Sequence, residues 1–155
     1  PFLANHCDVF YIGGTKVGAM MGEAVVFSGV KAPKYFFTNI KRHGALLAKG
    51  RMLGIQFDTL FTDELYFKIS RHAIAMATRI RSIFEKHGIA IAYDSPTNQQ
   101  FVVLSPALYE AISQKVAFEI WERKSEHEII CRFVTSWATK EEELDELDHI
   151  LQAYA

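Results

Sequence analysis

Apolar residues near the start of the chain form two short runs that are typical of β-strands. They cover residues 9–12 (VFYI) and 23–27 (EAVVF), and β-branched and aromatic side chains are common in both. A glycine-rich connection, GGTKVGAMMG, lies between them. The first run reads as a buried strand with nothing before it to pair, and a sheet cannot be one strand wide. We therefore expect the chain to be part of a longer protein.

The middle of the chain has a weak helical pattern followed by a strong one. Residues 35–60 have apolar positions at helical spacing but also three glycines, which predicts an interrupted helical segment. From about residue 63 to residue 88, apolar positions repeat at alternating steps of four and three, which predicts one amphipathic helix. These positions are Ile69, Ala73, Met76, Ile80, Ile83 and His87. Gly88 is well suited to the carboxyl end of this helix.

The last third of the chain alternates between short strands and helices. The strand-like runs are IAIAY, QFVVL, AFEIWERK and HEIICRFVTSW. Ser105 with Pro106 predicts a helix start, and Thr139 with Glu142 predicts a capping box before a final helix. That helix is expected to bury Leu144, Leu147, Leu151 and Tyr154. The pattern predicts a small α/β domain: a mostly antiparallel sheet with helices against one face.

Composition and charge narrow the class of protein. Half of the 155 residues are hydrophobic, and 17 basic residues stand against 18 acidic ones, as in ordinary soluble domains. Nothing is basic enough to predict nucleic acid as a partner, and no apolar run approaches the roughly 20 residues that span a bilayer. Cys7 and Cys131 do not have metal-ligand spacing, so we expect no metal site. We also expect a buried free thiol at Cys131 and a reducing, cytoplasmic setting.

Lys16 is the first candidate for chemistry, because it stands between Gly14 and Gly18 directly after a strand. A lysine that attacks an aldehyde must be unprotonated, and burial and a nearby cation favour that form. Gly13 and Gly14 would leave room for a flat ring, and Thr15 has a hydroxyl that can bond a phosphate. A solvated lysine at a loop tip is the alternative interpretation. The spacing is not that of a nucleotide P-loop.

Three strings in the chain are similar to one enzyme family. CDVFYIGGTKVGAMMGEAVVF resembles the region around the cofactor lysine of the threonine aldolase and β-eliminating lyase family, which are fold type I (aspartate-aminotransferase-like) pyridoxal-phosphate enzymes. FFTNIKRHGALLAKGRMLGIQF resembles the segment that leads into the long interdomain helix of that family. CRFVTSW resembles the small-domain strand whose arginine holds the substrate carboxylate. The resemblance covers nearly the whole chain, in order, and corresponds to the carboxy-terminal half of such an enzyme.

This resemblance implies an α/β fold in three parts. Residues 1–62 would be the end of a PLP-transferase-like large domain, residues 63–88 the interdomain helix, and residues 89–155 the small carboxy-terminal domain with its mostly antiparallel sheet.

The resemblance also implies pyridoxal 5'-phosphate as the cofactor and a role for five residues. Lys16 would form the Schiff base and later shuttle protons, with Gly14 and Thr15 beside the cofactor. Arg51, in a basic segment, would approach the cofactor phosphate. Arg132 would pair with the substrate α-carboxylate, a task suited to the guanidinium fork, and an edge-strand arginine in a salt bridge is the alternative.

The basic segment departs from the GGGMRQ-like pattern of many threonine aldolases. Which of its side chains reaches the phosphate therefore stays open, and a solvated helix face is the alternative for at least two of them. The candidates are Arg42, His43, Lys49 and Arg51.

The implied reaction is the cleavage of a β-hydroxy-α-amino acid, such as L-threonine, to glycine and an aldehyde by a homodimer or homotetramer. Another fold type I enzyme (an aromatic amino-acid lyase, a decarboxylase or a desulfurase) and a non-catalytic module derived from one are the alternatives. In this superfamily the residues that bind the pyridine ring lie before the lysine in sequence. We therefore expect the 155 residues alone to be inactive.

Overall fold

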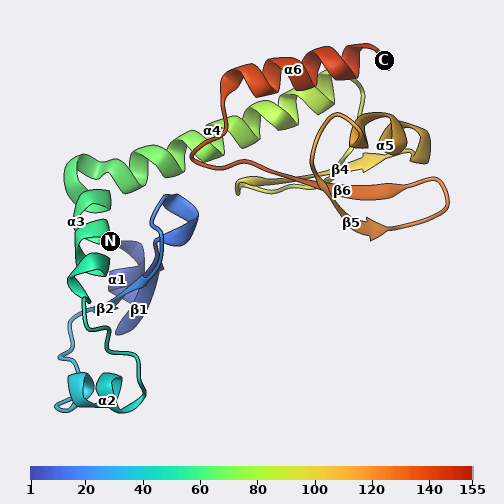
Figure 1. Ribbon diagram of the computed structural model, residues 1–155. Helices are drawn as coiled ribbons and strands as arrows, with labels where there is room; N and C mark the ends of the chain where they lie inside the picture. Colours follow the sequence, from blue (N-terminus) through green and yellow to red (C-terminus); the bar gives the residue numbers. More distant parts are fainter. Residues whose placement is uncertain (155) are drawn as a thin grey trace. The chain divides into compact units, whose positions relative to one another are not determined.

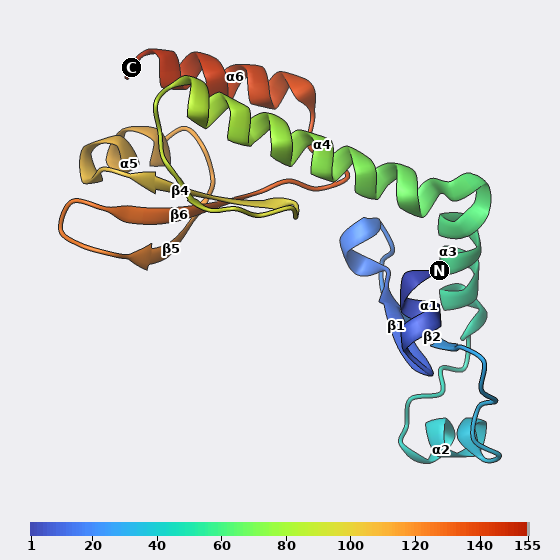
Figure 2. The same ribbon diagram turned by 180° about the vertical axis from the view of Figure 1, so that it is seen from behind.

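The structure is a computed structural model that describes residues 1–154, and it contains two compact units. The amino-terminal unit covers residues 1–67, and the carboxy-terminal unit begins at residue 68. Figure 1 and Figure 2 show the elements of each unit from opposite sides.

The amino-terminal unit contains a two-stranded antiparallel sheet. Strand β1 (Val9–Gly13) pairs with β2 (Glu23–Phe27), which confirms both predicted strands. The expected burial of the first strand is wrong for this unit, because one face of a two-stranded ribbon has no cover and Val9 and Tyr11 are exposed. The other elements are α1 (Phe2–His6), η1 (Thr15–Val17), α2 (Phe36–Arg42), α3 (Arg51–Phe61) and η2 (Thr62–Glu64).

The helical segments follow the predicted pattern closely. Helices α2 and α3 are separated by residues 43–50, as the glycine-interrupted pattern predicts. The next helix, α4 (Leu65–Lys86), begins after Asp63 and Glu64, whose φ values of 50° and 58° lie in the left-handed region that ends the preceding helix. Gly88 has φ 72° and follows the end of α4, where the amide of Ile89 bonds the Phe84 carbonyl at 2.9 Å. The predicted C-terminal glycine is confirmed.

The carboxy-terminal unit is a four-stranded antiparallel sheet with helices against one face. The strand order is β3-β4-β6-β5, so β4 and β6 are central and every pairing is antiparallel. Figure 1 and Figure 2 both show α4 and α6 side by side over this sheet. The elements after α4 are β3 (Ile91–Tyr93), β4 (Gln99–Leu104), α5 (Pro106–Ser113), β5 (Glu119–Arg123), β6 (Ile129–Val134) and α6 (Glu141–Gln152).

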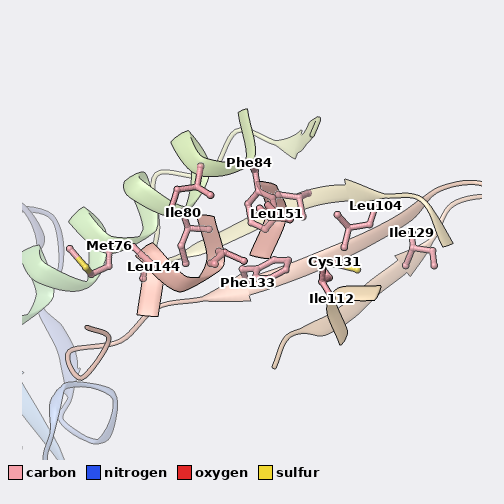
Figure 3. Packing of buried hydrophobic residues seen from close by; sticks show 13 residues of the cluster. Met76, Ile80, Phe84, Leu104, Ile112, Ile129, Cys131, Phe133, Leu144 and Leu151 are labelled. Atoms are coloured by element: carbon pink, nitrogen blue, oxygen red, sulfur yellow. The ribbon is translucent and has the colours of Figure 1, made fainter. Parts of the chain in front are cut away.

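The hydrophobic core of this unit lies between the sheet and its helices (Figure 3). Phe133 of β6 packs on Phe84 of α4, with ring centroids 4.7 Å apart. The predicted stripe of α4 is buried at Ala73, Met76, Ile80 and Ile83. Cys131 is the predicted buried free thiol, and burial raises its pKa to about 11, which keeps it protonated.

Two details of the helix ends differ between sequence and structure. Ser105 caps α5 as predicted, accepting a bond from the Leu108 amide at 3.2 Å. The capping box of α6 is shifted by one residue: its N-cap is Lys140, whose amide bonds the Glu143 carboxylate at 2.9 Å. The Thr139 hydroxyl instead accepts the Ser136 amide of the preceding turn, at 2.9 Å.

The expected burial of Tyr154 is also wrong. The helix ends at Gln152, and Tyr154 is exposed, with the Lys115 ammonium 5.4 Å from the centre of its ring. The other three residues predicted for the apolar face of α6 are buried, namely Leu144, Leu147 and Leu151.

Candidate functional site

Lys16 lies on a short 3-10 turn, η1, directly after β1, and its side chain is exposed. The turn is closed by its own backbone, because the amides of Val17 and Ala19 both bond the Gly14 carbonyl at 3.0 Å. Gly18 then reverses the chain with φ 98°, a conformation that favours glycine. The lysine is therefore presented by a turn with a defined backbone rather than by a loose loop.

Helix α3 braces this turn from the side. The Gln56 side chain accepts a bond from the Met20 amide at 2.7 Å, across 36 residues of sequence. A Cβ added to Gly14 would lie 2.9 Å from the Ala19 Cβ and 3.0 Å from the Phe57 ring, so only glycine allows this packing. The turn that carries Lys16 is thus held against α3 by close packing and by one long-range hydrogen bond.

The two glycines before Lys16 have different surroundings. Gly14 is buried, and the space beside its Cα is filled by the protein itself. Gly13 is exposed, and nothing lies within 4 Å of the position that a Cβ would take. Thr15 is exposed beside Lys16. Open space therefore lies beside the Gly13 Cα, whereas the Gly14 backbone packs against the protein.

An apolar cavity of about 520 Å³ begins at the end of this turn. This volume lies within the range of small-molecule pockets. Its lining comprises Gly18, Met20, Met21, Leu47, Ala48, Lys49, Met52, Ile55 and Gln56. Of the basic segment, Lys49 is in this lining, whereas Arg51 is an exposed residue at the first position of α3.

Arg132 lies in the carboxy-terminal unit, on the central strand β6. Its strand neighbours Cys131 and Phe133 face the core, so alternation places Arg132 on the opposite face of the sheet. One terminal nitrogen, Nη1, donates to the Gln99 side chain at 3.1 Å, and the other, Nη2, donates to the Glu119 carboxylate. Both partners come from the strands on either side of β6.

Trp121 packs against the Arg132 guanidinium, whose central carbon is 5.4 Å from the centre of the ring. The register of β5 shifts between Ile120 and Glu122, so Trp121 stands at a β-bulge, a feature that re-aims a side chain. The rings of Phe101, on β4, and Trp121 meet edge to face, with centroids 5.2 Å apart. Trp121 therefore contacts both a cation and an aromatic ring.

Four of the five residues predicted for the site lie in the amino-terminal unit. Gly14, Thr15 and Lys16 share one turn, and Arg51 lies in the same unit. Arg132 belongs to the other unit.

Three residues that hold these candidates in place were not predicted: Gln56, Gln99 and Glu119. Glu119 is directly opposite Arg132 in the register, so strand pairing could have found it. Gln56 could not be found from sequence spacing, because its partner is 36 residues away.

Residues 1–154 contain neither a cluster of metal-binding side chains nor a helix that could span a membrane. No group of three or more His, Cys, Asp or Glu side chains is arranged to hold a metal ion in this range. No helix within it is long and apolar enough to cross a membrane.

Comparison with known proteins gives relatives of one kind. No protein-family model matches the chain. Low-specificity L-threonine aldolases of Pseudomonas sp. (strain NCIMB 10558) and of Pseudomonas aeruginosa are 28% and 27% identical to it over 141 residues. The matched region is 90% of this chain but 40% of each relative, so the chain spans less than half the length of these curated relatives.

Solved structures agree with this result. A threonine aldolase of Leishmania major matches 98% of the chain with a TM-score of 0.91 and 35% identity, over 44% of its own length. An 8-amino-7-oxononanoate synthase of Francisella tularensis matches 85% of the chain with a TM-score of 0.53 and 12% identity, which shows a shared fold alone. The expected resemblance to threonine aldolases and the expected α/β fold are both confirmed.

Proposed function

We propose that this threonine aldolase-like chain is the carboxy-terminal half of a pyridoxal-phosphate-dependent aldolase that cleaves an L-threonine-like β-hydroxy-α-amino acid to glycine and an aldehyde. The observation that carries the proposal is the backbone match to a threonine aldolase over 98% of the chain, with a TM-score of 0.91. A braced turn that presents an exposed lysine is the chemical feature that fits it.

The residues present fit one task for such a cofactor, which is to anchor its aldehyde. Lys16 is accessible, its turn is fixed by α3, and the backbone at Gly13 is open to a flat ring. The Thr15 hydroxyl, beside Lys16 and exposed, can donate a hydrogen bond to a phosphate oxygen. These residues support binding of the group at the η1 turn.

The chemistry is divided between the cofactor and the protein. Pyridoxal phosphate, when bound, supplies an electron sink for cleavage of the substrate Cα–Cβ bond. Lys16 Nζ would hold the aldehyde of the cofactor, and the same nitrogen would hold or return a proton near the substrate Cα. Arg132 orients the substrate by pairing with its α-carboxylate.

The basic segment supplies a candidate for the phosphate. Lys49 lines the apolar cavity beside Gly18, and Arg51 opens α3. We propose that one of these two cations approaches the phosphate. A homodimer or homotetramer in the cytoplasm and an inactive state of the 155 residues alone are parts of the same proposal.

The direct test is the replacement Lys16→Ala in the full-length protein that carries this chain. Turnover of L-threonine to glycine and acetaldehyde should fall by at least about a hundredfold, because both the anchor and the proton carrier are lost. Lys31→Ala is the control, since this exposed lysine lies in the linker after β2. Activity of the Lys16→Ala protein equal to that of the control would rule out the proposed role of the lysine.

Feeding L-threonine, L-tyrosine and L-cysteine to the same preparation identifies the reaction. Glycine and acetaldehyde from L-threonine are expected. Phenol from L-tyrosine or sulfide from L-cysteine as the main product would replace the aldolase proposal by a different enzyme of the same fold.

A further inference from the structure

Only two of the three guanidinium nitrogens of Arg132 donate hydrogen bonds to side chains that the structure describes. Nη1 donates to Gln99, and Nη2 donates to the Glu119 carboxylate. The third nitrogen, Nε, is buried, and no residue that the structure describes accepts a hydrogen bond from it. A buried donor without an acceptor is unfavourable, so this arginine has unused capacity to bind an anion.

The position of the unused donor matters. Nε and Nη2 together form one edge of the guanidinium plane, and this edge can hold a carboxylate with two parallel hydrogen bonds. Glu119 bonds Nη2 and leaves Nε without an acceptor. A free carboxylate that took the whole edge would make one more charge-assisted bond than Glu119 does.

Two features of the surroundings favour this exchange. Glu119 is on the edge strand β5, and 68% of its side chain is exposed. Water can therefore solvate its carboxylate after the bond to Arg132 is broken. Arg132 is held from two other directions, by Gln99 at Nη1 and by the Trp121 ring against its face. The arginine thus keeps its orientation while its acidic partner is replaced.

We propose that the Glu119 carboxylate pairs with the Arg132 guanidinium in the absence of ligand, and that the α-carboxylate of an amino acid displaces it. The inference rests on the proposed function, since it takes Arg132 as the group that binds the substrate carboxylate. Glu119 then lowers the affinity for every carboxylate ligand. It also favours ligands that engage both Nε and Nη2 over those that reach one nitrogen.

The test is a titration of the cofactor-free chain with glycine, read from Trp121 fluorescence. Trp137→Phe is the parent protein, because it leaves Trp121 as the one tryptophan of the sequence. With ionic strength held constant, Glu119→Gln should bind glycine about two- to fivefold more tightly than the parent, the range expected for loss of an exposed ion pair. Arg132→Gln should remove the saturable response.

The matched control is Glu122→Gln, on the same strand. The Glu122 carboxylate accepts a bond from the Tyr93 hydroxyl at 3.3 Å rather than from Arg132, so glycine affinity should stay at the parent value. Acetate, which lacks the amine, should show the same order of variants as glycine, because the exchange involves the carboxylate alone.

Two results would overturn the inference: equal glycine affinity in the parent and in Glu119→Gln, or no saturable response in either. Circular dichroism checks folding, and Glu119→Ser is the second variant, with the same expected gain in affinity. Because no cofactor is present, failure here leaves the Lys16 result untouched. Activity of Lys16→Ala equal to that of its control, together with intact glycine binding, would instead count against the proposed function.

Discussion

At the scale of single residues, the neighbours Gly13 and Gly14 show how the same residue type has two uses in one turn. A methyl group at Gly14 would come within 2.9 Å of the Ala19 Cβ and 3.0 Å of the Phe57 ring. A methyl group at Gly13 would meet nothing within 4 Å. The first glycine leaves space beside the candidate lysine, and the second allows the turn to pack on α3.

We therefore expect Gly14→Ala to destabilise the amino-terminal unit by about 1–3 kcal/mol, the usual effect of overpacking. Gly13→Ala is the control and should change stability far less. Hydrogen exchange of the β1 and β2 amides is the appropriate measurement, because both tryptophans lie in the carboxy-terminal unit. Equal loss of protection in the two variants would show that the close packing at Gly14 does not hold the turn.

At the scale of elements, one acid of α6 is shared by two basic residues at the end of α4. The Asp148 carboxylate of α6 accepts bonds from the Lys86 ammonium at 2.7 Å and from the His87 ring at 2.6 Å. These hydrogen bonds, that of Lys86 first, lower the pKa of Asp148 below its usual value. The charged form is thus more favourable in the folded than in the unfolded chain.

Because the pKa of Asp148 is lower in the folded chain than in the unfolded one, its carboxylate stabilises the fold above the unfolded pKa, near pH 4. This stabilisation is lost as the pH falls through the folded pKa. The stability of the parent protein should therefore fall more steeply between pH 5 and about pH 3 than that of Asp148→Asn. Urea midpoints followed by tryptophan fluorescence measure this difference. Glu146→Gln, an exposed acid of the same helix, should keep the parent slope. Identical slopes in Asp148→Asn and the parent would contradict the account.

Most elements could be predicted because their signals are local. The stripe of α4, the glycine after it and the Ser105 cap depend on residues within one or two turns. The capping box was misplaced by one residue because the Thr139 hydroxyl bonds the preceding turn, a competition that spacing cannot reveal. The bulge at Trp121 has no local signal either, since it depends on how β5 pairs with β6.

At the scale of the whole molecule, the candidate site could be predicted only in part. The flanking glycines and a string that resembles a family predict Lys16, and such a string alone predicts Arg132. The groups that orient them depend on the fold: Gln56 reaches the lysine turn across 36 residues, and Glu119 meets Arg132 through strand pairing. The chain spans 40–44% of the relatives it matches, so the proposed cofactor site would take its other contacts from residues outside these 155.

The central claim is that Lys16 anchors pyridoxal phosphate. The most direct measurement is borohydride reduction of the full-length protein with the cofactor, followed by mass spectrometry of its peptides, with the 155-residue chain treated in parallel. We expect a pyridoxyl group on Lys16 in the full-length protein, and none on the 155 residues alone, which lack the rest of the proposed cofactor site. A pyridoxyl group on another lysine of the full-length protein, or on none, would contradict the claim.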